Sequence, residues 1–84
     1  MTTGTAVDIV DDVLVLDDDS IRLLLTEAAG WHRTAQLSMS AGDHNAARYA
    51  YRMRETLARY IAARSHLGFH EARARAIVIS RRLD

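Results

Sequence analysis

The chain has 84 residues, of which 49% are hydrophobic and 26% are charged, and its 11 basic and 11 acidic residues give a net charge of zero. A chain of this length forms one domain with a modest core, since it buries only about 60% of the surface that its unfolded form exposes. It has no cysteine, which excludes disulfides, thiolate metal sites and thiol catalysis. The composition is that of a globular helical protein and excludes the disordered and fibrous classes.

The charges are unevenly distributed along the chain. Residues 1–42 contain seven acidic residues and two arginines, whereas residues 43–84 contain four acidic residues and nine arginines, so the halves carry about −5 and +5. Either the acidic half covers the basic half, or the basic half has an anionic partner. We favour the first interpretation, because a neutral chain gains little long-range attraction for nucleic acid.

The N-terminal part of the chain gives a weak structural signal. We expect residues 1–7 to form a disordered tail. The acidic segment 8–19 follows, and its apolar run, residues 13–16, is rich in β-branched side chains. A strand here would lack a partner strand within the chain. Because Ile9, Val13 and Leu16 also have helical spacing, the segment is predicted as a short strand, an extended segment or a helical turn.

A first helix is predicted from about residue 21 to residue 40. Residues 17–20 offer N-cap oxygens and place negative charge at the positive end of the helix dipole. His32 lies within the apolar stripe, so in a core it would need a hydrogen-bond partner or a depressed pKa. Leu23 and Leu37 point away from the stripe. The stripe recurs at 3.6-residue spacing and should face the core: Ile21, Leu24, Leu25, Ala28, His32, Ala35 and Met39.

Two further helices are predicted, at about residues 44–67 and 69–82. Gly42 and Asp43 suit a helix end followed by an N-cap, and Gly68 should end the second helix. Arg48, Arg52 and Arg59 line the outer side of the second helix. Its apolar face is predicted to pack on the first helix: Ala46, Tyr49, Ala50, Met53, Leu57, Tyr60 and Ile61.

The first two helices resemble a tetratricopeptide-type hairpin over about 30 residues. Trp31, the turn at Gly42, and Ala47 with Tyr51 carry that resemblance. It implies a protein-binding scaffold. Thr34 and Ser38 depart from the pattern, no closing proline follows and no second repeat exists, so no family is assigned.

A second motif is a helix-turn-helix-like segment over residues 57–82. The residues at 67 and 68 would form its turn, and the helix from His70 would carry Arg73 and Arg75 to phosphates and base edges. Against DNA binding, Arg64 stands where the preceding helix usually has a small residue, and residues 77–79 place apolar side chains around the reading helix.

Catalytic and metal-binding patterns are weak. His66 and His70 are separated by Gly68, which breaks the i,i+4 ligand geometry. The acidic residues at 17–19 fit helix capping, and no glycine-rich phosphate loop or nucleophile elbow is present. We therefore expect no enzyme, cofactor, metal site or membrane insertion, and a cytoplasmic protein.

The sequence predicts one small all-α domain, a three-helix fold built on a long antiparallel helical hairpin and preceded by the acidic segment. Surplus apolar positions indicate an interface. We expect a non-enzymatic interaction module that forms a homodimer and binds a protein partner, with a small DNA-binding regulator as the alternative. Self-association residues are predicted at Val13, Leu14, Val15, Leu16, Leu23 and Leu37. Residues for a partner or nucleic acid are predicted at Arg48, Arg52, Arg59, Arg73, Arg75, Arg81 and Arg82.

Overall fold

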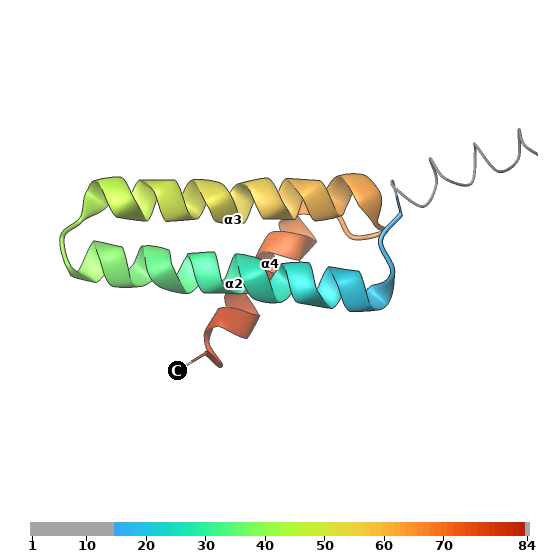
Figure 1. Ribbon diagram of the computed structural model, residues 1–84, viewed down its shortest axis with the longest axis horizontal. Coiled ribbons are helices and arrows are strands. Elements are labelled where there is room, and N and C mark those ends of the chain that lie inside the picture. The colour runs from blue at the N-terminus through green and yellow to red at the C-terminus, as the bar shows by residue number, and fades with distance from the viewer. Residues whose placement is uncertain (1–14, 84) are drawn as a thin grey trace, which may run out of the picture.

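The computed structural model describes residues 15–83, which form three helices that pack against one another (Figure 1). Helix α2 spans Asp18–Ser40, α3 spans His44–Arg64 and α4 spans Phe69–Ser80. The described part of the chain contains no strand. The predicted all-α fold with its long hairpin is therefore confirmed, whereas residues 8–14 of the acidic segment lie outside the described residues.

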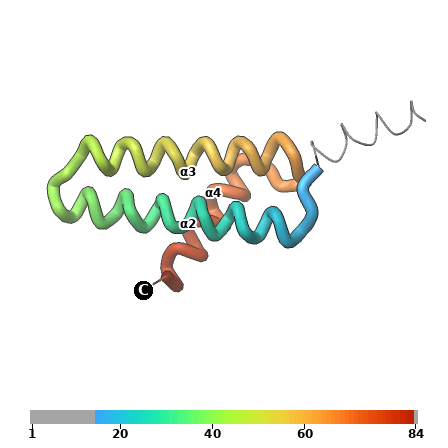
Figure 2. The backbone as a smooth tube through the Cα atoms, in the orientation of Figure 1, coloured from blue at the N-terminus to red at the C-terminus, as the bar shows by residue number. Residues whose placement is uncertain are grey.

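The hairpin is set by local signals in the sequence. Asp17, one of the N-cap candidates at residues 17–20, accepts a hydrogen bond from the backbone N–H of Ser20 at 2.7 Å, so α2 begins earlier than the predicted residue 21. Asp43 accepts one from the backbone N–H of Ala46 at 3.0 Å, and this predicted N-cap is confirmed. Gly42 has a φ of +81°, a conformation that glycine adopts without a steric penalty. The chain therefore reverses directly between α2 and α3, as the smooth backbone trace shows (Figure 2).

The end of α3 differs from the prediction, because the helix stops at Arg64 and not near Gly68. The hydroxyl of Ser65 donates to the carbonyl oxygen of Ile61 at 2.7 Å and accepts from the backbone N–H of Leu67 at 3.1 Å. The Ser65 side chain thus satisfies backbone groups at the helix end. Gly68 instead occupies the N-cap position of α4. This turn places Leu67, which is buried, beneath α4.

Helix α4 starts on the side of the hairpin where α2 begins and α3 ends, and crosses α2 closer to the middle of the hairpin (Figure 1). It is 12 residues long and therefore spans about 18 Å, roughly half the length of α2. No helix in residues 15–83 is both long and apolar enough to cross a membrane. The core cluster lies at this crossing and consists of Ile21, Leu25, Ala58, Ile61, Leu67 and Ala72.

The buried face of α3 matches the predicted face only in part, since Ala50 and Ile61 are buried as predicted. Tyr49 and Tyr60 are 56% and 42% exposed, and Met39 of α2 is 46% exposed, so these three assignments to the core are wrong. Small side chains lie at the α2–α3 contact instead, which lets the two helix backbones approach closely. The buried residues of α3 are Ala47, Ala50, Ala58 and Ile61. The true inner face is rotated by about a quarter of a turn from the predicted one.

Candidate functional site

A network of polar side chains joins all three helices. Arg54 Nη1 lies 2.8 Å from Nδ1 of His32 on α2. The Nε and Nη2 atoms of Arg54 donate to one oxygen of Glu55 at 3.1 and 2.8 Å. The other oxygen of Glu55 lies 3.6 Å from Nη1 of Arg73 on α4. Arg54 is 12% exposed and Glu55 is 22% exposed, so this network is largely shielded from water.

The hydrogen bond from Arg54 fixes the protonation state of His32. A guanidinium only donates, so Nδ1 of His32 must accept and the ring must be neutral with its proton on Nε2. His32 is 7% exposed. Burial lowers the pKa of His32 below its usual 6.5, and the positive charges of Arg54 and Arg81 lower it further. The sequence predicted that a buried His32 would need a polar partner or a depressed pKa, and the contact with Arg54 supplies the partner.

Sequence reasoning missed Arg54 because an arginine is rarely placed on the inner face of a helix. Its position continues the line of small buried residues on α3, seven residues after Ala47 and four before Ala58. That spacing, together with His32 in the apolar stripe of α2, is the signal that would have identified the contact between Arg54 and His32. The network links the three helices through their side chains, and this geometry supports a structural role.

An apolar groove of about 400 Å³ lies between α2 and α3, and no residue of α4 lines it. Farther along the same hairpin, the rings of Trp31 and Tyr49 meet edge to face at 5.7 Å between centroids. Met53 lies between these two features on the turns of α3. We call this surface the open face. The groove is lined by Leu16, Ser20, Leu23, Leu24, Leu57 and Tyr60.

Arg64, which lies beside Tyr60 of this groove, has one unsatisfied polar atom. The guanidinium carbon of Arg64 lies 4.0 Å from the ring centroid of Tyr60, a cation–π distance. The Nε atom of Arg64 is buried and has no hydrogen-bond partner among the described residues. A buried donor of this kind is rare in folded proteins.

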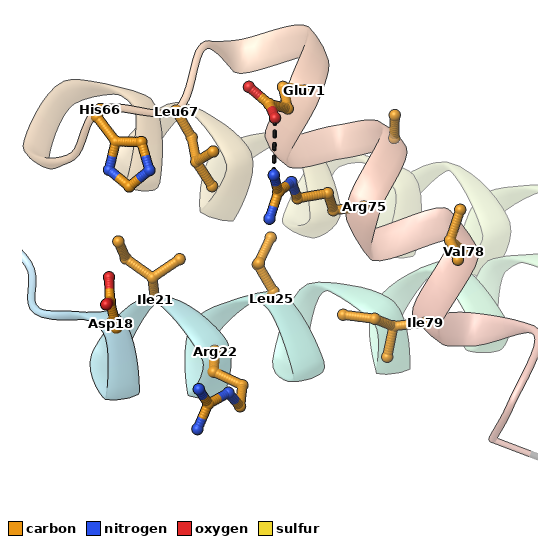
Figure 3. Close-up of a pocket in the computed structure, with 11 residues that line it drawn as sticks. Asp18, Ile21, Arg22, Leu25, His66, Leu67, Glu71, Arg75, Val78 and Ile79 are labelled. Carbon is orange, nitrogen blue, oxygen red and sulfur yellow. Dashed lines mark hydrogen bonds and ion pairs between the residues drawn. The ribbon is translucent and has the colours of Figure 1, made fainter.

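A second groove, of about 600 Å³, lies between the first half of α2 and the outer side of α4. Its floor is formed by Ile21, Leu25 and Leu67 (Figure 3). On α4, Arg75 donates to Glu71 at 2.9 Å across the groove wall. Because Glu71 and Arg75 are paired on this wall, they give the groove little net charge with which to attract a charged ligand.

Arginines line one side of α3, and this side meets α4 at Arg59. Arg48, Arg52 and Arg59 are exposed and lie on one side of α3 at spacings of four and seven residues. The guanidinium carbons of Arg59 and Arg73 lie 5.4 and 5.3 Å from the ring centroid of Phe69, which brings α4 to the same edge. We call these four residues, Arg48, Arg52, Arg59 and Arg73, the arginine strip.

The other predicted arginines lie elsewhere. Arg75 lines the α4 groove, and Arg81 and Arg82 are exposed just after the end of α4. Arg73 and Arg75, the residues expected to read DNA from the third helix, are each paired with a glutamate of this chain. The predicted arginines therefore lie in three places: the arginine strip, the groove beside α4 and the residues that follow α4.

The predicted self-association residues are also divided. Leu16 and Leu23 line the groove of the open face, and Leu23 is 72% exposed. Val15 and Leu37 are 64% and 54% exposed but do not line that groove. Val13 and Leu14 lie outside the described residues.

Within residues 15–83, no three histidine, aspartate or glutamate side chains are grouped so that they could hold a metal ion. His66 lies in the turn before α4, whereas His70 lies in its first turn, where its Nδ1 is 3.2 Å from Nη2 of Arg73. Comparison of the chain with protein-family models, with curated proteins and with solved structures finds no match.

Proposed function

We propose that this protein is a non-enzymatic helical interaction module that self-associates through the open face of its hairpin. The observation that carries the proposal is the apolar surface that α4 leaves uncovered. Leu23, Tyr49 and Tyr60 expose 72%, 56% and 42% of their surface there. Large apolar side chains clustered in this way favour an interface over a solvated face.

The occupant that best fits this surface is a second copy of the chain. The open face has a groove at one end, against Leu57 and Tyr60, and the Trp31–Tyr49 pair at the other. A two-fold axis through the middle of the face would place the aromatic pair of each copy on the groove of its partner, as an isologous interface requires. Two hairpins would then form a four-helix arrangement.

The size of the open face agrees with this occupant. A hairpin about 35 Å long and two helix diameters wide presents about 700 Å². A standard protein interface buries about 800 Å² on each partner. Aromatic residues and methionine, which this face contains, are enriched in such interfaces.

Light scattering over a dilution series tests the proposal. We expect a dimer mass at micromolar concentration, and a monomer mass for Leu23→Glu, which places a charge in the groove. Val78→Glu is the matched control, because Val78 is 45% exposed and lies on the α4 side. A native monomer mass at every concentration would disprove self-association. Equal disruption by the two variants would exclude the open face as the interface.

Binding to duplex DNA at low salt tests the alternative function. Salt-dependent retention of the native chain, lost in Arg75→Ala, would support a regulator that uses α4. The pairing of Arg73 and Arg75 with glutamates of this chain favours the interaction module.

A further inference from the structure

We propose that the arginine strip is the docking site of residues 8–12 of the same chain, the first part of the acidic segment. This docking segment lies outside the described residues and contains Asp8, Asp11 and Asp12. It would shield the strip from other anions. This contact is independent of the proposed dimer, because it joins two parts of one chain.

The charge balance of the described residues supports this occupant. Residues 15–83 hold all 11 arginines but only seven of the 11 acidic residues, and therefore carry a net charge of +4. The four acidic residues that would neutralise this charge are Asp8, Asp11, Asp12 and Asp84. Three of them lie within five consecutive positions.

The unbalanced positive charge is concentrated at the strip. Glu55 is the carboxylate that lies among the four arginines, and it is already bound to Arg54 and lies 3.6 Å from Arg73. Arg48, Arg52 and Arg59 have exposed side chains. Guanidinium groups bind carboxylates through paired donors. The arginine strip can therefore bind carboxylates in addition to Glu55.

The position of Leu16 places the segment within reach of the strip. The backbone N–H of Leu16 donates to the carbonyl oxygen of Arg64 at 2.6 Å, which fixes the chain at the end of α3. An extended chain covers about 3.5 Å per residue, so Asp12 and Asp8 reach about 14 and 28 Å from Leu16. Arg59 and Arg52 lie about 8 and 18 Å from Arg64 along α3. Both distances are shorter than the available reach.

Neutralising the segment in the full chain tests this docking. The variant D8N/D11N/D12N removes three negative charges with little change in side-chain size. The probe is a fluorescein-labelled peptide with the sequence of residues 6–14, added at low ionic strength. We expect the variant to bind this peptide about tenfold more tightly than the native chain, because its own segment no longer competes. Raising the salt concentration should remove the difference.

Arginine substitutions in the D8N/D11N/D12N background locate the peptide. R52A/R59A should abolish the gained affinity, whereas R22A/R75A removes the same number of arginines away from the strip and should retain it. Circular dichroism verifies that both variants keep their helices. Equal peptide binding by the native chain and D8N/D11N/D12N would overturn the proposal, as would equal losses in the two arginine variants.

Two further measurements separate the competing explanations. The first compares the affinity of a short single-stranded DNA for the native chain and for D8N/D11N/D12N. Equal affinities would show that the strip is open to phosphates with the segment in place, and would overturn the proposal. The gain in peptide affinity should persist in the Leu23→Glu background. Loss of the gain there would assign the contact to neighbouring copies and contradict docking within one chain.

Discussion

Arg54 of α3 donates a hydrogen bond to His32 of α2 at 2.8 Å, across the interface of the hairpin. This contact joins residues 22 positions apart and sets a cation beside an imidazole that must stay neutral. The pair therefore makes the hairpin sensitive to both pH and the loss of either side chain.

The stability of the fold should decrease as the solution becomes acidic. The pKa of His32 is lower in the folded state than its usual 6.5, so folding favours the neutral ring. The stabilising contribution is complete above about pH 6.5 and is lost as the pH falls from there through the folded-state pKa. Urea unfolding between pH 7.5 and 5 measures this loss. In His32→Gln, whose amide oxygen can accept from Arg54 without titrating, the pH dependence should be weaker. An unchanged pH dependence would show that His32 does not cause it.

Removal of Arg54 should destabilise the protein more than removal of a surface arginine. Arg54→Ala leaves Nδ1 of His32 and one oxygen of Glu55 without their donor, at a cost of about 1–3 kcal/mol in the free energy of unfolding. Arg52→Ala, on the exposed side of α3, should change it by about 0.5 kcal/mol or less. Chemical denaturation of the two variants compares these costs. A larger effect for Arg52 would show that the buried network contributes little.

Ile61 should be the more sensitive of two apolar positions on α3. Its side chain is fully buried, whereas Leu57 lines the groove of the open face and is half-buried. Ile61→Ala removes transfer free energy and leaves a cavity, together about 2–5 kcal/mol, and Leu57→Ala should cost less in dilute solution. The loss of helical circular dichroism on heating ranks the two variants. The reverse order would contradict the deeper burial of Ile61.

Alanine substitutions at two glycines should have opposite effects. Gly30 lies within α2, and an added methyl group would meet no atom within 4 Å, so Gly30→Ala should stabilise the protein by about 0.5–1 kcal/mol. Gly42 has a φ of +81°, which strains any residue with a Cβ, so Gly42→Ala should destabilise it by about 1 kcal/mol. Thermal melting of both variants tests the signs. Equal shifts in one direction would contradict this assignment.

The sequence by itself determined the three helices and the turn of the hairpin. Asp17, Asp43 and Gly42 act through hydrogen bonds and backbone conformations within a few residues, so their roles are visible in the local pattern. The same holds for the inward position of His32, which follows from helical spacing on α2.

Only the tertiary structure decided which face of α3 lies inside. By hydrophobicity, the side with Tyr49, Met53 and Tyr60 is the more apolar, yet the alanine side is buried because small residues allow closer contact between α2 and α3. Arg54 joins that inner face through His32, which is distant in the sequence. The arginine strip likewise exists because α4 folds back and brings Arg73 to Glu55 and Arg59 to Phe69. Contacts between distant residues leave no periodic trace within either helix, and so three-dimensional packing alone reveals them.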